Sequence, residues 1–151
     1  MSAVEDRLAE LGLTVPDVAL PVAAYLPAVR DGNHIFTSGQ LPMVSGKVGE
    51  GPGLVPADDA KKLAQICALN AIAAVRAIVG DLDKVTRVVK VVGFVASDPA
   101  FTGQPGVVNG ASELLGTAFG DAGVHARSAV GVAVLPLDAP VEVEIIVSVR
   151  D

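Results

Sequence analysis

The sequence has few of the residues that build disulfides, metal centres and aromatic surfaces. Its 151 residues include one cysteine, two histidines, no tryptophan and only 3% aromatic residues. One cysteine excludes an intrachain disulfide, and these few ligands form no spaced cluster of the kind that holds zinc. We therefore expect no metal. Cys67 lies in an alanine-rich helical segment, and we interpret it as a buried, inert thiol rather than a reactive one.

Charged residues are also scarce, and positive ones more so than negative ones. They make up 19% of the chain, and the net charge is −6. Binding to nucleic acid relies on clustered Lys and Arg that neutralise phosphates, so this balance argues against it. A typical domain carries about 25% charged residues, so this chain has few charges to cover its surface. Large exposed apolar areas usually mark a partner, and we expect a homo-oligomer.

Long apolar runs and targeting signals are likewise missing from the sequence as read. No apolar run approaches the roughly 20 residues that span a membrane. The first residues, MSAVEDRLAELGL, are acidic rather than basic and do not resemble a secretory signal. We therefore expect a cytoplasmic protein that does not bind membranes.

The N-terminal segment predicts a short helix. Ser2 and Glu5 have capping-box spacing, apolar residues follow at helical spacing, and Gly12 ends the pattern. We expect a helix over 3–11 that lies on the body of the protein or on a neighbour, followed by a proline-rich connector. The chain then reads as one domain over 1–151, with 1–20 as its N-terminal helix and connector. Because so short a helix is marginal, we expect residues 1–12 to be dispensable for the core fold.

The rest of the chain predicts an α+β fold, a single sheet of at least five strands packed against two helices. The β-branched segments indicate strands and the alanine-rich segments indicate helices. We expect, in order, two short strands around the turn at 31–33, a glycine-rich loop over 44–54, a helix over 57–79, a strand over 84–97, a helix over 105–119, and a hairpin of strands over 126–135 and 141–149.

This last hairpin carries charges in an otherwise apolar stretch. Arg127 alternates with very small residues on one strand, and Glu142 and Glu144 lie on the other. One interpretation is an ordinary solvated sheet face; the other is a site. In a hairpin, Glu142 would pair near Ala133 and lie ~20 Å from Arg127 at the usual strand rise. If both residues serve one pocket, it must therefore lie between chains.

The same residues carry a resemblance to a known family. Ala126-Arg127-Ser128, followed by Leu135-Pro136 and then VEVE at 141–144, resembles the C-terminal signature of the RidA family, also called the YjgF/YER057c/UK114 family, of reactive imine and enamine deaminases. Upstream, the segment from Tyr25 to TSGQLP at 37–42 resembles the family's N-terminal hairpin. Phe101 and Asn109 also fall at matching places.

The resemblance implies a chorismate-mutase-like fold in a homotrimer with pockets between subunits. It also implies hydrolysis of 2-imino or 2-enamino acids to 2-oxo acids and ammonia without a cofactor. Arg127 and Glu142 are then the catalytic residues. Arg127 would bind the substrate carboxylate through two parallel hydrogen bonds, and Glu142 would orient or deprotonate the attacking water. Gly39, which lacks a Cβ, would let the backbone approach the substrate closely.

The remaining pocket residues follow from the same resemblance. Tyr25 and Asn109 would line the pocket, although a plain packing role for Tyr25 is an equal alternative. Ala129 stands where many family members have a cysteine, so a water held there by a thiol must be held otherwise. His34 is interpreted as structural. His125 stands where the family usually has proline, and we interpret it as a surface residue, with a base at the pocket rim as the alternative.

Two other functions compete with the deaminase. A non-catalytic trimer that binds a small carboxylate, as a sensor or partner-binding protein, would use Arg127 equally well. A Glu142 free to bind water favours the enzyme, whereas a Glu142 in a salt bridge favours the binding protein. An endoribonuclease, an activity sometimes attached to the family name, fits poorly with a net charge of −6 and few aromatics for stacking bases.

Overall fold

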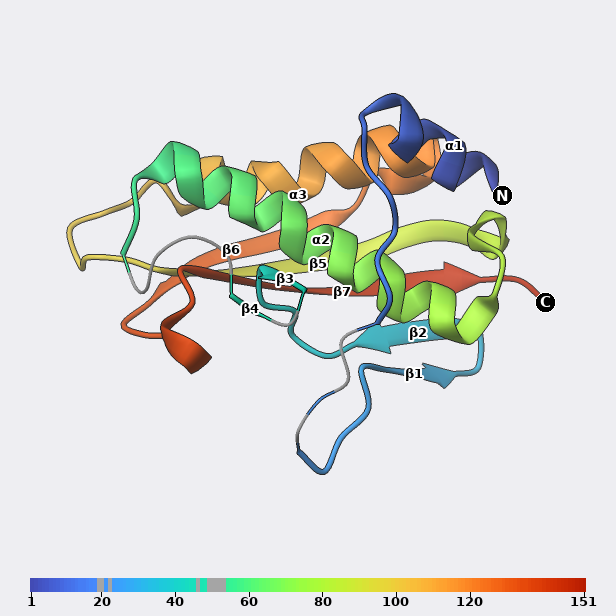
Figure 1. The fold of residues 1–151 in the computed structure, drawn as a ribbon, viewed down its shortest axis with the longest axis horizontal. Helices are drawn as coiled ribbons and strands as arrows, with labels where there is room; N and C mark the ends of the chain where they lie inside the picture. The colour runs from blue at the N-terminus through green and yellow to red at the C-terminus, as the bar shows by residue number, and fades with distance from the viewer. Residues whose placement is uncertain (19–20, 22, 46, 49–53) are drawn as a thin grey trace.

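Two long helices, α2 and α3, lie side by side across one face of a mixed five-stranded sheet in the computed structural model of this chain (Figure 1). The structure describes residues 1–18, 21, 23–45, 47–48 and 54–151. The helices are α1 (Ala3–Glu10), α2 (Ala57–Val79) and α3 (Gln104–Phe119). The strands are β1 (Ala28–Asp31), β2 (His34–Thr37), β3 (Met43–Val44), β4 (Lys47–Val48), β5 (Val85–Ala96), β6 (Ala126–Val132) and β7 (Val141–Val149).

The sheet order is β1-β2-β7-β5-β6, so the predicted hairpin of the last two strands is wrong. β6 pairs in parallel with β5, and β7 lies antiparallel between β5 and β2. The helix α3 joins β5 to β6, and such a crossover is the connection that parallel strands require. β6 also ends at Val132 rather than at 135, because its partner β5 ends at Ala96, opposite Val132.

The other predicted elements lie within one or two residues of the observed ones, with one omission. The predicted glycine-rich loop over 44–54 includes part of a short β3–β4 pair, in which Met43 pairs with Val48. Residues 46 and 49–53 of that loop, and 19, 20 and 22 of the predicted connector, lie outside the described residues. Pro27 precedes β1, which is an edge strand, as its position next to a proline suggests.

The helix α2 forms the centre of the core. Asp58 and Asp59 lie in its first turn, where acidic groups favour the helix dipole, and Gly80 ends it with a positive φ of 74°. Cys67 is 0% exposed, as predicted, and burial raises the pKa of its thiol well above the usual value.

Among the described residues, α2 is the helix whose length and apolar composition would suffice to cross a membrane. This helix belongs to the core of the fold, since 61% of its most apolar 18-residue window is buried.

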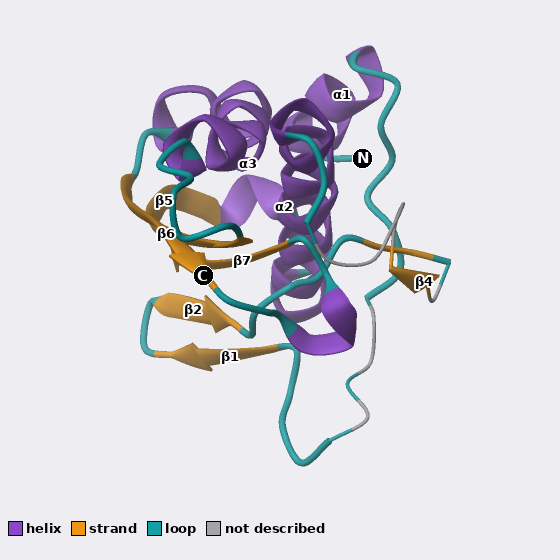
Figure 2. Ribbon diagram, turned by 90° about the vertical axis from the view of Figure 1, so that its left-hand side faces the viewer, coloured by secondary structure: helices purple, strands orange, loops and turns teal. Residues whose placement is uncertain are grey.

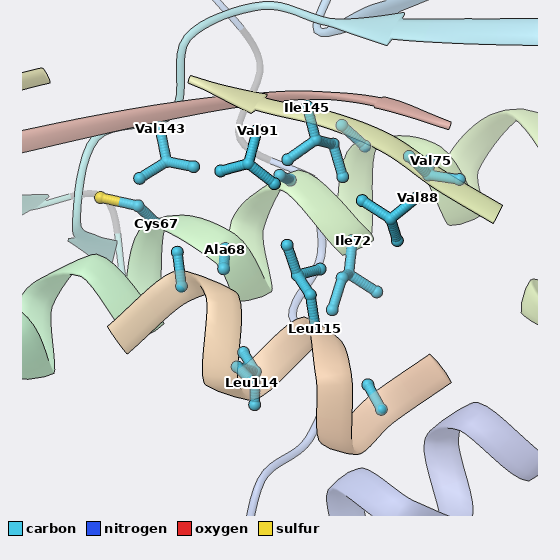
Figure 3. Close-up of a cluster of buried hydrophobic side chains, with 14 of the residues drawn as sticks. Cys67, Ala68, Ile72, Val75, Val88, Val91, Leu114, Leu115, Val143 and Ile145 are labelled. Atoms are coloured by element: carbon cyan, nitrogen blue, oxygen red, sulfur yellow. The ribbon is translucent and has the colours of Figure 1, made fainter. Parts of the chain in front are cut away.

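The core joins both long helices to the two central strands (Figure 3). Ile72 and Val75 of α2 and Leu115 of α3 pack with Val91 of β5 and Ile145 of β7, each at most 1% exposed. Burial of one such side chain contributes about 1.5–3 kcal/mol. This packing fixes the position of α3 over β5 and therefore beside β6.

The N-terminal helix α1 belongs to this core, so the expectation that residues 1–12 are dispensable is not supported. Leu8 is 0% exposed and lies in the main hydrophobic cluster. Glu5 forms an ion pair with Arg76 of α2 at 2.9 Å. The backbone N–H of Ser2 and the Arg76 guanidinium together lower the pKa of Glu5 to about 2. Arg7 donates to the carbonyl of Ala118 at 2.7 Å, which ties α1 to α3.

Candidate functional site

One face of the sheet, here called the open face, carries no helix of this chain among the described residues (Figure 2). It carries the apolar side chains of Phe36, Val92, Phe94, Val130 and Ile146, which alternate with the residues buried under α2 and α3. Phe36 is 40% exposed and Val130 44% exposed. The open face is therefore the uncovered apolar surface that the low charge content predicted.

Arg127 of β6 points toward α3, on the other side of the sheet. Its Nη1 donates to Oδ1 of Asn109 at 2.7 Å and to Oγ of Ser112 at 3.2 Å. Its Nη2 donates to the carbonyl of Pro105 at 3.2 Å. The structure therefore brings the predicted residues Arg127 and Asn109 together. Ala129 pairs with Gly93, as Arg127 pairs with Val91, so Ala129 shares this face.

These three bonds leave part of the Arg127 guanidinium available. A guanidinium has five N–H donors, and both protons of Nη1 are used. Within the described part of the chain, the Nε proton and one Nη2 proton have no acceptor. Nε and Nη2 form one planar edge, which matches the two oxygens of a carboxylate. The Arg127 side chain is thus held in place by α3 and retains donors for a ligand.

Two residues of this corner were missed or misread from the sequence. Ser112 follows Asn109 by three positions, so both side chains lie on one face of α3. This spacing could have identified Ser112 as a site residue from the sequence. His125 was interpreted as a surface residue, but it is only partly exposed and bonds to Ser112 Oγ at 2.8 Å and to the Gly123 carbonyl at 2.6 Å. His34 is exposed on β2, beside the ring of Phe36.

Glu142 of β7 lies against Gly39 at a second corner of the sheet. A Cβ on Gly39 would stand 2.6 Å from Oε2 of Glu142, closer than real Cβ atoms approach. The predicted reason for glycine was a close approach of the backbone to the substrate. The structure gives another reason: the missing side chain leaves room for the Glu142 carboxylate.

The Glu142 carboxylate is partly buried and forms no ion pair within the described residues. Burial raises its pKa, and the nearby Glu144 carboxylate raises it further. Both effects disfavour the charged form and make the ionised carboxylate a stronger base.

Tyr25 lies in the loop before β1 and is 56% exposed. The hydroxyl of Ser38 donates to the Leu26 carbonyl at 2.6 Å, and the Ser38 N–H donates to the Pro27 carbonyl at 2.8 Å. These bonds place the backbone that follows Tyr25 next to the backbone that precedes Gly39. Tyr25, Gly39 and Glu142 therefore come from neighbouring segments.

The two corners lie on opposite faces of the sheet. Phe94 of β5 pairs with Glu142 on one side and with Val130 on the other, so these three side chains share the open face. Arg127 is an odd number of residues from Val130 and points to the helix side. The predicted pairing of Glu142 near Ala133 is therefore wrong, because Glu142 aligns with Val130 across β5. Arg127 and Glu142 are kept apart by lying on opposite faces of the sheet.

A cavity of about 350 Å³ lies between the end of β5, the start of α3 and the end of β6. Its lining includes Ser97, Phe101, Gln104, Gly131 and Ala133. Gly131 and Ala133 follow Ala129 along the chain, so two of the small residues that alternate with Arg127 line this cavity.

Comparison with known proteins identifies the family. A family model described as "YjgF/chorismate_mutase-like, putative endoribonuclease" matches residues 5–148. The solved structure of the protein Atu1372 of Agrobacterium tumefaciens, of unknown function, has a TM-score of 0.90 and 46% identity and covers 99% of this chain and 94% of its own. Protein TCP17 of Trypanosoma cruzi is 40% identical and covers 96% of this chain and 93% of its own. The 2-iminobutanoate/2-iminopropanoate deaminase of Escherichia coli (strain K12) is 36% identical and covers 83% of this chain and 87% of its own. The chain therefore belongs to the RidA/YjgF family, with its mixed α+β, chorismate-mutase-like fold.

Proposed function

We propose that this chain forms a homotrimer that hydrolyses 2-imino and 2-enamino acids to 2-oxo acids and ammonia, without a cofactor. Each pocket combines the Arg127 corner of one subunit with the Glu142 corner of the next. The observation that carries the proposal is the Arg127 guanidinium, which is held by three acceptors and retains the Nε proton and one Nη2 proton for a ligand.

The substrate carboxylate binds to the Nε–Nη2 edge of Arg127. Two parallel N–H···O bonds fix both the position and the plane of the carboxylate, which a lysine ammonium cannot do. Because the C=N group is conjugated with the carboxylate, fixing this plane also fixes the direction from which water reaches the imine carbon. Asn109 and Tyr25 line the pocket, and the absent thiol at Ala129 leaves additional space.

Glu142 supplies the base. Water adds its oxygen to the imine carbon, and Glu142 takes the proton that the water releases. The carboxylic acid then returns that proton to the nitrogen, which gives a carbinolamine. Glu142 next takes the hydroxyl proton and passes it to the nitrogen, and the C–N bond breaks as the C=O bond forms, so that ammonia and a 2-oxo acid are released. An enamine is first protonated at carbon to give the imine. A carboxylate whose pKa is raised by burial suits both proton transfers.

The open face and the two corners support the trimer. The apolar residues exposed on the open face are the kind of surface that a partner subunit usually buries. Arg127 and Glu142 lie on opposite faces of one sheet, so a second copy is needed to bring them to the same substrate.

A non-catalytic carboxylate-binding trimer is the alternative. It needs Arg127 but no free base, and it is favoured by a Glu142 engaged with a cation. Within one chain, Glu142 has no such partner among the described residues, which favours the enzyme. The endoribonuclease named in the family description has less support, because a net charge of −6 opposes the binding of phosphates.

A panel of 2-imino acids tests the proposal. A separate amino-acid oxidase generates each imine in situ, and the appearance of the 2-oxo acid is followed with and without this protein. We expect faster 2-oxo acid formation with wild type and no acceleration with Glu142→Gln at the same concentration. Tight binding of 2-oxo acids without any acceleration would instead support the binding protein. A monomer mass by light scattering at micromolar concentration would contradict the shared pocket.

A further inference from the structure

A chain of hydrogen bonds runs behind Arg127, away from the edge that faces the proposed ligand. Nη1 of Arg127 contacts Ser112 Oγ at 3.2 Å, Ser112 Oγ contacts His125 Nε2 at 2.8 Å, and His125 Nδ1 contacts the Gly123 carbonyl at 2.6 Å. The chain thus links β6, α3 and the turn after α3 to one guanidinium group.

The direction of each bond follows from the chemistry of the groups. A carbonyl can only accept, so Nδ1 of His125 carries a proton and donates it to Gly123. In the neutral ring, Nε2 is then an acceptor and takes the hydroxyl proton of Ser112. The Ser112 oxygen turns its lone pairs toward Arg127, which can only donate. Bonds that all run in one direction polarise and strengthen one another.

His125 is needed because a serine inside a helix has another option. Such a hydroxyl commonly donates to the carbonyl four residues earlier, which turns its lone pairs elsewhere. The acceptor on His125 draws the Ser112 proton away from the helix backbone. Ser112 then stands beside Asn109 as the second fixed acceptor for Nη1.

The Ser112–His125 contact also resembles that of an activated nucleophile, but its surroundings do not suit that role. Ser112 lies in the interior of α3, where each backbone N–H is bonded within the helix and is not free to stabilise an oxyanion. Its oxygen already accepts a hydrogen bond from Arg127, which weakens it as a nucleophile.

We infer that Ser112 and His125 are positioning residues that hold the Arg127 guanidinium so that its Nε–Nη2 edge faces the carboxylate ligand. The role toward a ligand rests on the proposed function, whereas the ordering of Arg127 does not. Neither residue touches the substrate. Together with Asn109 and Pro105, they set the plane of the carboxylate-binding group.

The first test is binding of pyruvate, measured by calorimetry on the intact protein. Ser112→Ala removes one acceptor from Nη1 and should raise the pyruvate Kd about tenfold, because a bond to a charged group is lost. His125→Ala should raise it several-fold, and His125→Gln, whose side-chain amide can reach Ser112, should restore most of the affinity. Thr117→Ala removes an exposed hydroxyl from the same helix and should leave the Kd unchanged.

The second test needs no ligand. In protein labelled with ¹⁵N-arginine, a guanidinium held by three acceptors gives separate Nη1 and Nη2 resonances, and Arg127→Lys identifies the signals of Arg127. We expect these signals to merge in Ser112→Ala and His125→Ala and to reappear in His125→Gln. Melting temperatures measured in parallel show that each variant is folded.

The outcomes separate the two proposals. If wild type does not bind pyruvate, the proposed function fails, and the arginine spectra still decide whether Ser112 and His125 order Arg127. If Ser112→Ala and His125→Ala keep resolved Arg127 signals, the positioning role is overturned, whether or not pyruvate binds.

Discussion

The Arg127 corner and the Glu142 corner differ in how far one chain satisfies their charged groups. Arg127 has three acceptors from α3, and behind them Ser112 and His125 continue the hydrogen-bond chain. Glu142 has room beside Gly39 but no ion pair among the described residues, and burial raises its pKa. The Arg127 guanidinium is fixed by its own chain, whereas the Glu142 carboxylate lies in an environment that disfavours its charge.

This difference matches the two tasks in the proposed reaction. A binding group works best when its orientation is fixed before the ligand arrives, because less freedom is lost on binding. A base works best when its charge is not neutralised by a neighbour. The two corners lie on opposite faces of one sheet, so under the proposed function each chain contributes to two different pockets.

The largest expected effect comes from removing the base. Glu142→Gln keeps the shape of the side chain but cannot accept a proton, so the turnover rate should fall about a hundredfold or more. The Kd for pyruvate should change little, because Arg127 is intact. Steady-state kinetics and calorimetry on the same sample measure both quantities, and an unchanged rate would make Glu142 a structural residue.

Arg127→Lys should have the next largest effect, this time on binding. Lysine keeps the charge but loses the planar two-pronged contact, so the pyruvate Kd should rise about tenfold to a hundredfold. Arg127 also ties β6 to α3, so the melting temperature should fall by about 2–4 °C for each ~1 kcal/mol lost. Normal pyruvate affinity would remove Arg127 from the carboxylate site.

Gly39→Ala tests the room that Glu142 occupies. The added methyl group would overlap Oε2 of Glu142, so the carboxylate must move and the rate should fall about tenfold. Gly32→Ala, where a Cβ meets no atom but φ is positive, is a control for the general effect of alanine on a glycine of the same hairpin. A rate loss in Gly32→Ala as large as in Gly39→Ala would contradict this explanation.

The smallest effect is on stability. The folded protein raises the pKa of Glu142 above its ordinary value of 4.5, so the fold disfavours the ionised form. Stability should therefore decline as pH rises from 4.5 through the raised pKa, and the full cost should remain above it. Because the group is only partly buried, the cost should stay below ~1 kcal/mol. Glu142→Gln should melt slightly higher than wild type at neutral pH and not below pH 4.5, with trimer concentration held constant; a lower melting temperature at neutral pH would contradict the burial cost.

Local sequence patterns predicted most elements because their causes are local. The β-branched run at 84–97 and the alanine-rich segment at 57–79 indicate their structures without long-range information. Strand order is a different matter. The insertion of β7 between β2 and β5 depends on pairing between segments that are distant in sequence. The prediction that β6 and β7 pair as a hairpin was wrong because these two strands are neighbours in sequence but not in the sheet.

Contacts between distant segments also limited what could be predicted about the site. Arg127 and Asn109 could be named from family resemblance, and the structure brings them together. Ser112 and His125 could not, because their contact depends on how α3 lies over β6. The contact of Gly39 with Glu142 could not be predicted either, because Glu142 lies about a hundred positions away in the chain.

Mixed trimers test the shared pocket most directly. Arg127→Lys and Glu142→Gln chains are refolded together in equal amounts, and each variant is refolded alone as a control. If every pocket takes Arg127 from one subunit and Glu142 from another, random mixing leaves about a quarter of the pockets with both wild-type residues. We expect about a quarter of the wild-type rate at low substrate concentration. A rate equal to the average of the two variants would place both residues in one chain's pocket and contradict it.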